Sequence, residues 1–432
     1  MSFEVAEHSL KSLCLLVVDC PHATPKWTDS GVVVLRNQNI KGGRLDLSSP
    51  SFTDEEHYQG RVRRAAPQGG DIVMTREAPM GDVCQIPRGL RCCVGQRQVL
   101  LRPDPKKVDG RFLLFALQSP YLQHQIGWNE GTGSTVSNLR IPVLEALRVP
   151  TPSLPDQLDI AETLGALDDR IALLRESNAT LEAIAQALFK SWFVDFDPVH
   201  AKQQGLTPAG MDEATAALFP VSFQESALGL VPKGWRPGVL GEVVRTIKSQ
   251  LHPSELRAAM NYVGLEHLPR KSLSLVNWGA ADGLESAKAK FSEGDVLFGK
   301  LRPYFHKVIV APFDGVCSTD ILVCQSKQRA YYGFTAMQLF SAELIAYADR
   351  LSNGAKMPRI GWNDIAAYPL IVPSEPIASA YTAVVSPVLD RMKGNVFRAQ
   401  TLATLRDTLL PRLISGQLRL PQAGIELAKV TA

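Results

Sequence analysis

Residues 164–193 read LGALDDRIALLRESNATLEAIAQALFKSWF. Apolar side chains recur along this stretch at alternating steps of three and four residues, which is the heptad pattern of a helix that packs against another helix. The sequence therefore predicts a long amphipathic helix whose packing seam consists of Leu164, Leu167, Ile171, Leu174, Asn178, Leu181, Ala185, Leu188 and Trp192, followed by Phe193.

A second stretch near the other end of the sequence has the same spacing. Pro155 and Pro376 precede the two stretches, in a position that suits a helix start. Two seams in one chain most simply pack on each other, so we expect an antiparallel pair of long helices. Asn178 either fixes the register of this pair from a buried position or lies at the seam edge and faces water. The second seam consists of Val385, Val388, Met392, Asn395, Ala399, Leu402, Arg406, Leu409 and Leu413.

The sequence also contains an internal repeat with a period of about 222 residues. Each half has short apolar runs, broken by glycine and proline, that are followed by a long helix. We therefore expect a mixed α/β (α+β) fold with two similar lobes, separated by the helix pair and related by pseudo-twofold symmetry. The matching segments are Gly70–Arg76 with Gly294–Lys300, Cys93–Gln96 with Cys317–Asp320, Leu147–Pro150 with Leu370–Pro373, and Thr180-Leu181 with Thr401-Leu402.

This repeat predicts a division of the chain into five segments. They are a first lobe over residues 1–153, a central helix over 154–198, a connector over 199–233, a second lobe over 234–373, and a distal helix with a C-terminal tail over 374–432. Within the lobes we expect helical stretches at Arg111–Gln125 and Tyr332–Arg350 and strands at Val32–Leu35, Asp71–Met74, Gln98–Leu101 and Val308–Val310.

Charge is distributed unevenly along the 432 residues, although the net charge is only +3. Residues 154–200 carry 3 basic and 9 acidic side chains, a net charge of −6, whereas residues 1–153, 201–373 and 374–432 each carry +3. Basic lobes favour contact with a phosphate backbone and an acidic helix does not. Differences of this size also fit ordinary scatter of surface charge.

The sequence offers no arrangement typical of catalysis. Gly294–Leu301 is similar to a phosphate-binding loop, but Leu301 stands where that loop needs a hydroxyl for magnesium. The eight histidines and seven cysteines lack metal-ligand spacing, and the cysteines fit a reducing compartment. The longest apolar run, Leu13–Val18, is far too short to span a membrane, and the start lacks an export signal. We therefore expect a cytoplasmic protein with no metal site, catalytic residue or membrane contact.

Several further segments form a recognisable set: Leu154–Gln157, Leu167–Ile171, Ala187–Phe196, Tyr262–His267, Gly294–Tyr304, Cys317–Asp320, Met357–Arg359 and Leu405–Gly416. This set resembles the specificity (S) subunits of type I restriction-modification systems. The resemblance covers almost the whole sequence and is weakest in the first lobe.

The resemblance implies that the lobes are target recognition domains, each of which reads one half of a bipartite site in double-stranded DNA. It also implies that the helix pair docks two adenine methyltransferase (M) subunits, with restriction/translocase (R) subunits in the full complex. S-adenosylmethionine, ATP and magnesium would then belong to those partners, so we expect no cofactor and no catalysis in this chain. A coiled-coil scaffold that binds only proteins is the alternative from another class.

Candidate DNA-contacting residues are basic or amide side chains near strand ends, because these residue types bind phosphates and base edges. A solvated loop position is the alternative for each. Trp192 and Phe193 are instead expected to anchor the end of the helix or a partner. The candidates are Arg36, Asn37, Gln38, Asn39, Lys41 and Arg76 in the first lobe, and His267, Lys300, Arg302, Lys356 and Arg359 in the second.

Overall fold

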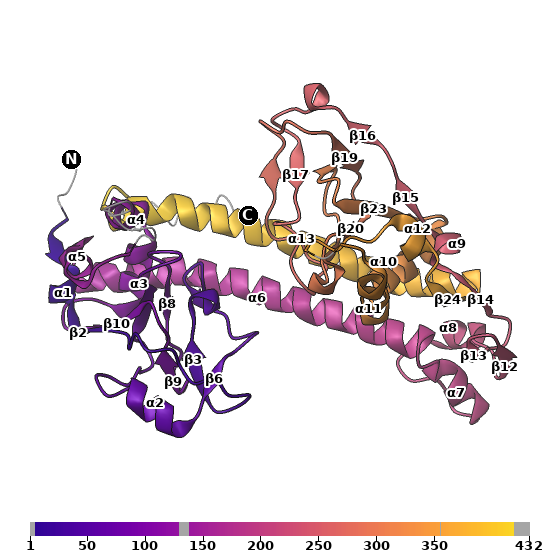
Figure 1. Ribbon diagram of the computed structural model, residues 1–432, viewed down its shortest axis with the longest axis horizontal. Helices are drawn as coiled ribbons and strands as arrows, with labels where there is room; N and C mark the ends of the chain where they lie inside the picture. The colour runs from indigo at the N-terminus through magenta and orange to yellow at the C-terminus, as the bar shows by residue number, and fades with distance from the viewer. Residues whose placement is uncertain (1–4, 129–137, 355, 419–432) are drawn as a thin grey trace. The chain divides into compact units, whose positions relative to one another are not determined.

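The computed structural model describes residues 5–128, 138–354 and 356–418, which form two compact units (Figure 1). Unit 1 contains the residues up to Arg170 together with those from Thr401 onward, and unit 2 contains Ile171–Gln400. Two 40-residue helices, α6 (Leu154–Phe193) and α13 (Glu375–Ile414), each contribute a part to both units. The boundary between the two units therefore falls within each long helix. The C-terminal tail after residue 418 lies outside the described residues.

Unit 1 contains a four-stranded antiparallel sheet in the order β2-β10-β7-β8. A smaller sheet, β6-β3-β9, has β3 and β9 parallel, and β1 pairs with β11. The elements are β1 (Glu7–Ser9), α1 (Leu10–Leu13), β2 (Cys14–Asp19), β3 (Val32–Leu35), η1 (Asn37–Asn39), β4 (Ile40–Lys41), β5 (Arg44–Leu45), β6 (Phe52–Thr53), α2 (Glu55–Arg61), β7 (Ile72–Thr75), β8 (Val83–Gln85), β9 (Cys92–Val94), β10 (Gln98–Pro103), α3 (Gly110–Gln118), α4 (Pro120–Gly127), α5 (Ile141–Ala146) and β11 (Arg148–Pro150).

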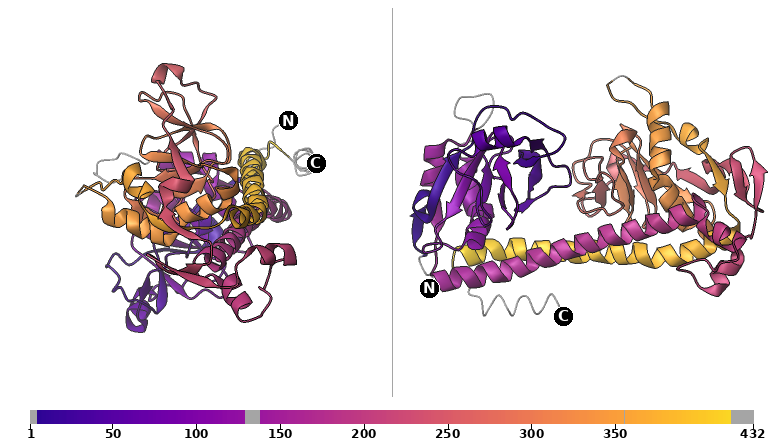
Figure 2. Two further views of the ribbon diagram at one scale, coloured as in Figure 1. Left: turned by 90° about the vertical axis from the view of Figure 1, so that its right-hand side faces the viewer. Right: turned by 90° about the horizontal axis from the view of Figure 1, so that it is seen from below.

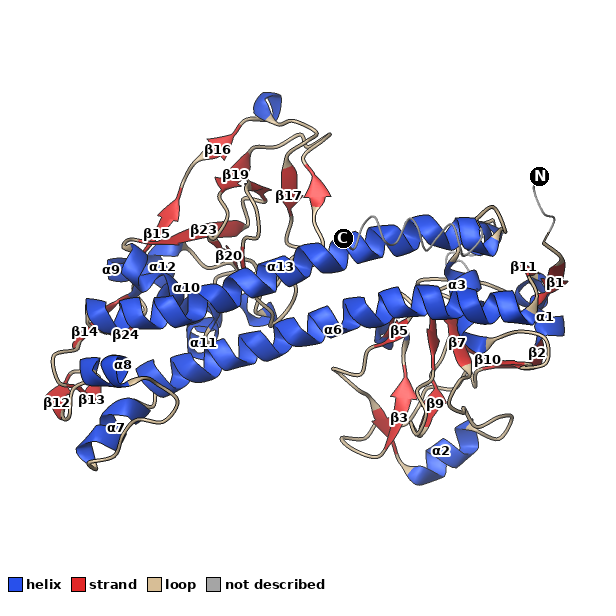
Figure 3. Ribbon diagram, turned by 180° about the vertical axis from the view of Figure 1, so that it is seen from behind, coloured by secondary structure: helices blue, strands red, loops and turns tan. Residues whose placement is uncertain are grey.

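Unit 2 repeats this arrangement with the sheet β15-β23-β20-β21, the parallel pair β17 and β22, and the pair β14 and β24. Figure 3 labels β15, β23, β20 and β17 of these strands. The expected connector is folded into two helices and a hairpin. The elements are α7 (Asp197–Gln203), α8 (Glu213–Leu218), β12 (Phe223–Ser226), β13 (Gly229–Pro232), β14 (Arg236–Val239), α9 (Leu240–Val243), β15 (Val244–Ile247), β16 (Gln250–Leu251), η2 (Pro253–Glu255), β17 (Asn261–Val263), β18 (Gly279–Ala280), β19 (Lys288–Phe291), β20 (Val296–Gly299), η3 (Pro303–Phe305), β21 (Val308–Val310), β22 (Gly315–Cys317), β23 (Ile321–Ser326), η4 (Arg329–Tyr331), α10 (Tyr332–Phe340), α11 (Ala342–Leu351), α12 (Trp362–Ala366) and β24 (Pro369–Val372).

The strand order confirms the predicted fold class of two similar mixed α/β lobes with two long antiparallel helices. Two details differ from the sequence prediction. Each expected helical stretch is broken in two by a serine, Ser119 or Ser341, whose extended backbone and side-chain oxygen cap the following helix. Pro155 and Pro376 lie inside the first helical turn, where no backbone N–H is needed.

The two long helices pack against each other within each unit (Figure 2). In unit 1, the Arg406 guanidinium of α13 lies 2.6 Å from the Asp168 carboxylate of α6. In unit 2, Asn395 Nδ2 donates to Asn178 Oδ1 at 2.9 Å, and Asn178 Nδ2 donates to the carbonyl of Met392 at 3.0 Å. Asn178 is therefore buried and hydrogen-bonded across the helix pair rather than facing water, the arrangement that fixes helix register.

Candidate nucleic-acid interface

The chain of the first lobe turns sharply at the end of β3. Asn39 closes this turn, because its backbone N–H donates to the carbonyl of Arg36 at 2.8 Å and its Oδ1 accepts from the N–H of Arg36 at 2.9 Å. Asn37 Nδ2 donates to the carbonyl of Glu77 at 2.6 Å, and Asn37 Oδ1 accepts from Gln98 Nε2 at 3.3 Å. The structure thus uses both asparagines to hold the turn.

Other predicted residues of this turn reach solvent. Arg36 and Gln38 are exposed, and the Arg36 guanidinium carbon lies 5.2 Å from the ring centroid of Trp27, which is itself exposed. Lys41 is also exposed, with Nζ 3.9 Å from the Asp46 carboxylate. An arginine that lies over an exposed indole ring can contact a phosphate group or a base edge of a nucleic acid. Sequence reasoning missed Trp27, which no local motif marks.

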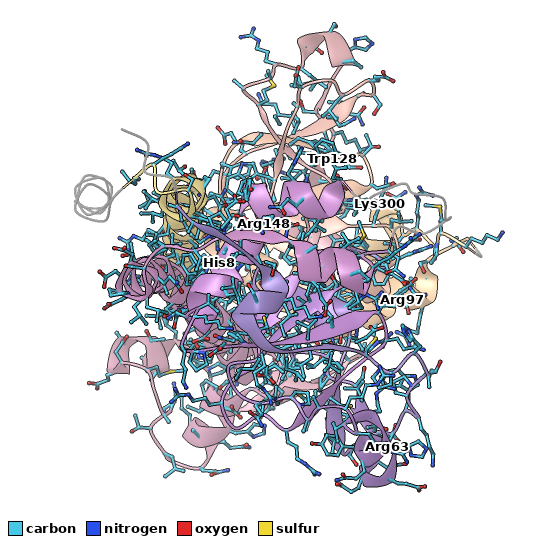
Figure 4. The ribbon with its side chains drawn as sticks, turned by 90° about the vertical axis from the view of Figure 1, so that its left-hand side faces the viewer. His8, Arg63, Arg97, Trp128, Arg148 and Lys300 are labelled. Carbon is cyan, nitrogen blue, oxygen red and sulfur yellow. The ribbon has the colours of Figure 1, made fainter. Side chains whose placement is uncertain are left out.

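Arg76 lies inside the fold. Its side chain is only 8% exposed, Nη1 lies 2.5 Å from the Asp19 carboxylate, and Nε donates to the carbonyl of Leu139. The structure therefore gives Arg76 a role in positioning the loop. Arg97, which was not among the candidates, lies at the neighbouring loop and is labelled in Figure 4. Its side chain is 57% exposed and pairs with Glu77 at 3.2 Å.

The second lobe has an equivalent turn at the end of β17. His267 N–H donates to the carbonyl of Gly264 at 3.1 Å, and the N–H of Gly264 donates to His267 Nδ1 at 2.9 Å. These are the two hydrogen bonds that Asn39 makes in the first lobe, so His267 also holds its turn. Between them, Glu266 is exposed and gives this turn a negative charge in place of the positive charge of the first.

The remaining second-lobe candidates come together on one surface. Arg302 Nη2 donates to the carbonyl of Lys356 at 3.0 Å. Arg359 pairs with Asp320 through two nitrogens at 3.0 and 3.3 Å, and the N–H of Lys300 donates to the carbonyl of that same Asp320. Four basic residues that are up to 59 positions apart in the sequence thus share one part of the lobe.

Three further cations extend this surface. Arg270 lies over the ring of Phe305 at 3.9 Å, and the N–H of Lys271 donates to the neighbouring residue of that turn, His306. Lys307 Nζ donates to a backbone carbonyl at 2.5 Å, and burial lowers the pKa of its ammonium group. We call Lys300, Arg302, Lys356, Arg359, Arg270 and Lys271 the second-lobe face, and Arg36, Gln38, Lys41, Arg97 and Trp27 the first-lobe face.

The two faces occupy equivalent positions in their lobes. The N–H of Leu139 donates to the carbonyl of Arg76 at 3.0 Å, and the N–H of Ile360 donates to the carbonyl of Lys300 at 3.1 Å. Together with the matching turns after β3 and β17, these bonds show that equivalent segments of the two lobes meet at the same edge. Loops that project from a rigid scaffold are where binding residues concentrate.

The expected packing residues lie in the cores of the two units. Trp192 lies 5.1 Å from Phe219 and 5.5 Å from Tyr381, measured between ring centroids, and Phe193 lies 5.0 Å from Phe334. These contacts make both aromatic residues anchors for the end of α6. Buried or partly buried at the helix pair are Leu164, Leu167, Leu402, Leu409 and Leu413 in unit 1, and Ile171, Leu174, Asn178, Leu181 and Leu188 in unit 2.

The cysteine side chains Cys84 and Cys317 are buried in the cores of the two lobes. Burial raises the pKa of Cys84 and Cys317 to about 12, which keeps both as unreactive thiols at neutral pH. In the part of the chain that the structure describes, no three His, Cys, Asp or Glu side chains are grouped to hold a metal ion. No helix in those same ranges is long and apolar enough to cross a membrane.

Comparison with known proteins identifies similar sequences and folds. Residues 26–183 match the family described as the type I restriction modification DNA specificity domain. The type I restriction enzyme MjaIX specificity subunit of Methanocaldococcus jannaschii is 25% identical over 367 residues, which cover 82% of this chain and 78% of that protein. The EcoDI specificity subunit of Escherichia coli is 28% identical over 267 residues, or 59% of this chain and 57% of that protein. A crystal structure of the type I restriction-modification S subunit from M. genitalium aligns with 94% of this chain and 95% of its own, at 16% identity and a TM-score of 0.49.

Proposed function

The chain is a relative of the specificity subunits of type I restriction-modification systems, and on this premise we propose that each of its lobes recognises one half of a bipartite DNA target. The observation that carries the proposal is the duplication of one loop edge, on which exposed arginine and lysine side chains and an exposed aromatic ring gather in each lobe, together with Gln38 in the first. These are the side-chain types that bind phosphates and read base edges.

The same proposal assigns the chemistry to partner subunits. Two adenine methyltransferase subunits and restriction/translocase subunits would supply the catalytic residues and bind S-adenosylmethionine, ATP and magnesium in the cytoplasm. The long helix α6 supports docking of such partners, because Leu158, Leu173 and Ile184 expose 55, 53 and 46% of their surface. The role of this chain would then be recognition alone.

The test is to co-express the chain with the methyltransferase encoded beside it and to map methylated adenines across the genome. We expect one bipartite motif with a constant spacer. Methylation without any bipartite motif, or no methylation by an assembled complex, would contradict the proposal.

A binding experiment separates DNA recognition from the protein-scaffold alternative. The affinity of the complex for DNA that carries the motif should fall steeply with salt, since each neutralised phosphate releases counterions. It should also exceed the affinity for scrambled DNA of the same length. A scaffold that binds only proteins would add no affinity to that of the methyltransferase alone.

A further inference from the structure

A short turn in the second lobe, η3 (Pro303–Phe305), is held in an unusual backbone conformation. The residues on either side of it, Arg302 and His306, have φ angles of +51° and +50°. Side chains larger than glycine rarely adopt this left-handed conformation, and it persists only where surrounding contacts enforce it. Such contacts are present on both sides of the turn.

Hydrogen bonds from three other segments hold this turn in place. The N–H of Arg302 donates to the carbonyl of Pro358 at 2.7 Å, and the N–H of Lys271 donates to the carbonyl of His306 at 2.9 Å. His306 Nε2 lies 2.8 Å from the carbonyl of Phe340. Burial lowers the pKa of His306, so its ring stays neutral at neutral pH and Nε2–H is the donor. The turn is therefore rigid before any ligand arrives.

This turn directs one aromatic side chain outward. Pro303 is buried, and Phe305 is covered by the guanidinium of Arg270 at 3.9 Å. Tyr304 packs edge-on against Phe305, with the ring centroids 4.6 Å apart, yet it remains 49% exposed. The stack of Arg270, Phe305 and Tyr304 fixes where the tyrosine ring points.

The surroundings of Tyr304 are strongly basic. Lys300 and Arg302 precede it in the same loop, and the segment that carries Lys356 is hydrogen-bonded to that loop. The nearby carboxylate of Asp320 is already paired with Arg359. An exposed ring among cations suits a ligand that combines a polyanionic backbone with flat or apolar groups, which is the chemistry of DNA bases.

We propose that Tyr304 contacts a base in the half-site read by the second lobe and so determines specificity there. This inference rests on the DNA recognition proposed above. The contact is made by the ring rather than the hydroxyl, because water satisfies an exposed hydroxyl, whereas the apolar ring gains by covering a thymine methyl group or a base step. The corresponding residue of the first lobe, Met80, packs against the core of unit 1, so the effect is confined to one half-site.

The test compares the methylation motifs of co-expressed complexes that carry Tyr304→Ala, Tyr304→Ser or Tyr304→Phe. A matched control is Tyr121→Ala, because Tyr121 is 45% exposed, lies on α4 in unit 1 and belongs to neither face. Both small replacements should raise methylation of sites with a substituted base at one or two adjacent positions of one half-site, by about tenfold. The phenylalanine variant and the control should retain the wild-type motif.

Each other outcome identifies what failed. If wild type yields a bipartite motif and the alanine and serine variants keep it unchanged, Tyr304 does not contact a base, although the lobes still recognise DNA. Loss of discrimination in both half-sites together with a lowered melting temperature would assign Tyr304 a structural role and overturn the inference. If Tyr304→Phe behaves like Tyr304→Ala, the ring does not make the contact. If wild type yields no bipartite motif, the proposed function itself fails.

Discussion

The turns after β3 and β17 share their backbone hydrogen bonds and differ in almost every side chain. Asn39 and His267 close them in the same way, with a side-chain acceptor 2.9 Å from the N–H three residues earlier. The exposed positions between differ in charge, since Arg36 and Gln38 occupy the first turn and Glu266 the second. The two lobes therefore share the hydrogen bonds that shape the edge, although different residues make them, and differ in the charge of the side chains that the edge exposes.

The helix pair shows the same contrast in its core. When α6 and α13 are aligned from their first residues, Asp168 and Arg406 in unit 1 correspond to Leu389 and Ala185 in unit 2. The first pair is an ion pair at 2.6 Å, and both members of the second pair are buried and apolar. Equivalent positions of the helix pair therefore accept either an ion pair or two apolar side chains. This is expected because a buried charge is costly only when it lacks its partner.

Trp192→Ala should have the largest effect on stability, and it should destabilise unit 2 without destabilising unit 1. Trp192 is 3% exposed and packs against several rings, whereas its counterpart at the end of α13 is Leu413. Loss of the ring should cost about 3–5 kcal/mol of stability. Hydrogen exchange of the assembled complex should show lost protection in unit 2 and retained protection in unit 1, with Leu413→Ala giving the reverse. Equal loss in both units after Trp192→Ala would contradict local anchoring.

Asp168→Ala tests whether the ion pair and its apolar counterpart are interchangeable. The variant leaves the Arg406 guanidinium, only 22% exposed, with the exposed Asp407 as its carboxylate partner and without the bond across the helix pair, and should cost about 1–3 kcal/mol. The double variant Asp168→Leu with Arg406→Ala imports the unit 2 residues and should recover most of that loss. Calorimetric melting of the two variants in the same complex checks this. A double variant that melts as low as Asp168→Ala would show that the two halves of the frame are not equivalent.

Arg36→Ala tests the first-lobe face directly. If Arg36 makes a bidentate base contact, its loss should weaken recognition of one half-site by about 1–3 kcal/mol and leave the other half-site unchanged. Arg63→Ala is the matched control, because Arg63 is an exposed arginine beside α2 that lies apart from Arg97 of the face (Figure 4). If the affinities for motif DNA and for scrambled DNA fall equally, Arg36 contacts a phosphate group and does not read a base.

The sequence predicted the helix pair and the duplicated lobes better than the interface. The heptad spacing predicted the helices because it reflects the local periodicity of a helix. The repeat offset predicted the two lobes because both halves of the chain have the same topology. The sequence did not distinguish the buried candidates from the exposed ones, since Arg76 and Arg36 have the same chemistry, and it is the tertiary contacts of Arg76 with Asp19 and the carbonyl of Leu139 that make it internal. Trp27 and Tyr304 were missed because the sequence around an aromatic residue does not show whether the folded chain leaves its ring exposed.

Glu182→Gln gives the smallest expected effect and concerns a difference between the helices, since the corresponding residue of α13 is Ala403. Glu182 Oε2 accepts from the N–H of Leu273 at 2.7 Å and from Ser272, but burial raises the pKa of this carboxyl. A raised folded-state pKa means that the wild type is most stable below the ordinary glutamate pKa and loses stability as pH rises through the folded value.

The amide oxygen of glutamine can accept the same bonds without a charge. The variant should therefore match wild type at acidic pH and exceed it by less than about 1 kcal/mol at neutral pH. Melting curves from pH 4 to 7 test this, and a variant that is less stable than wild type at pH 7 would show that the charged carboxylate is needed there.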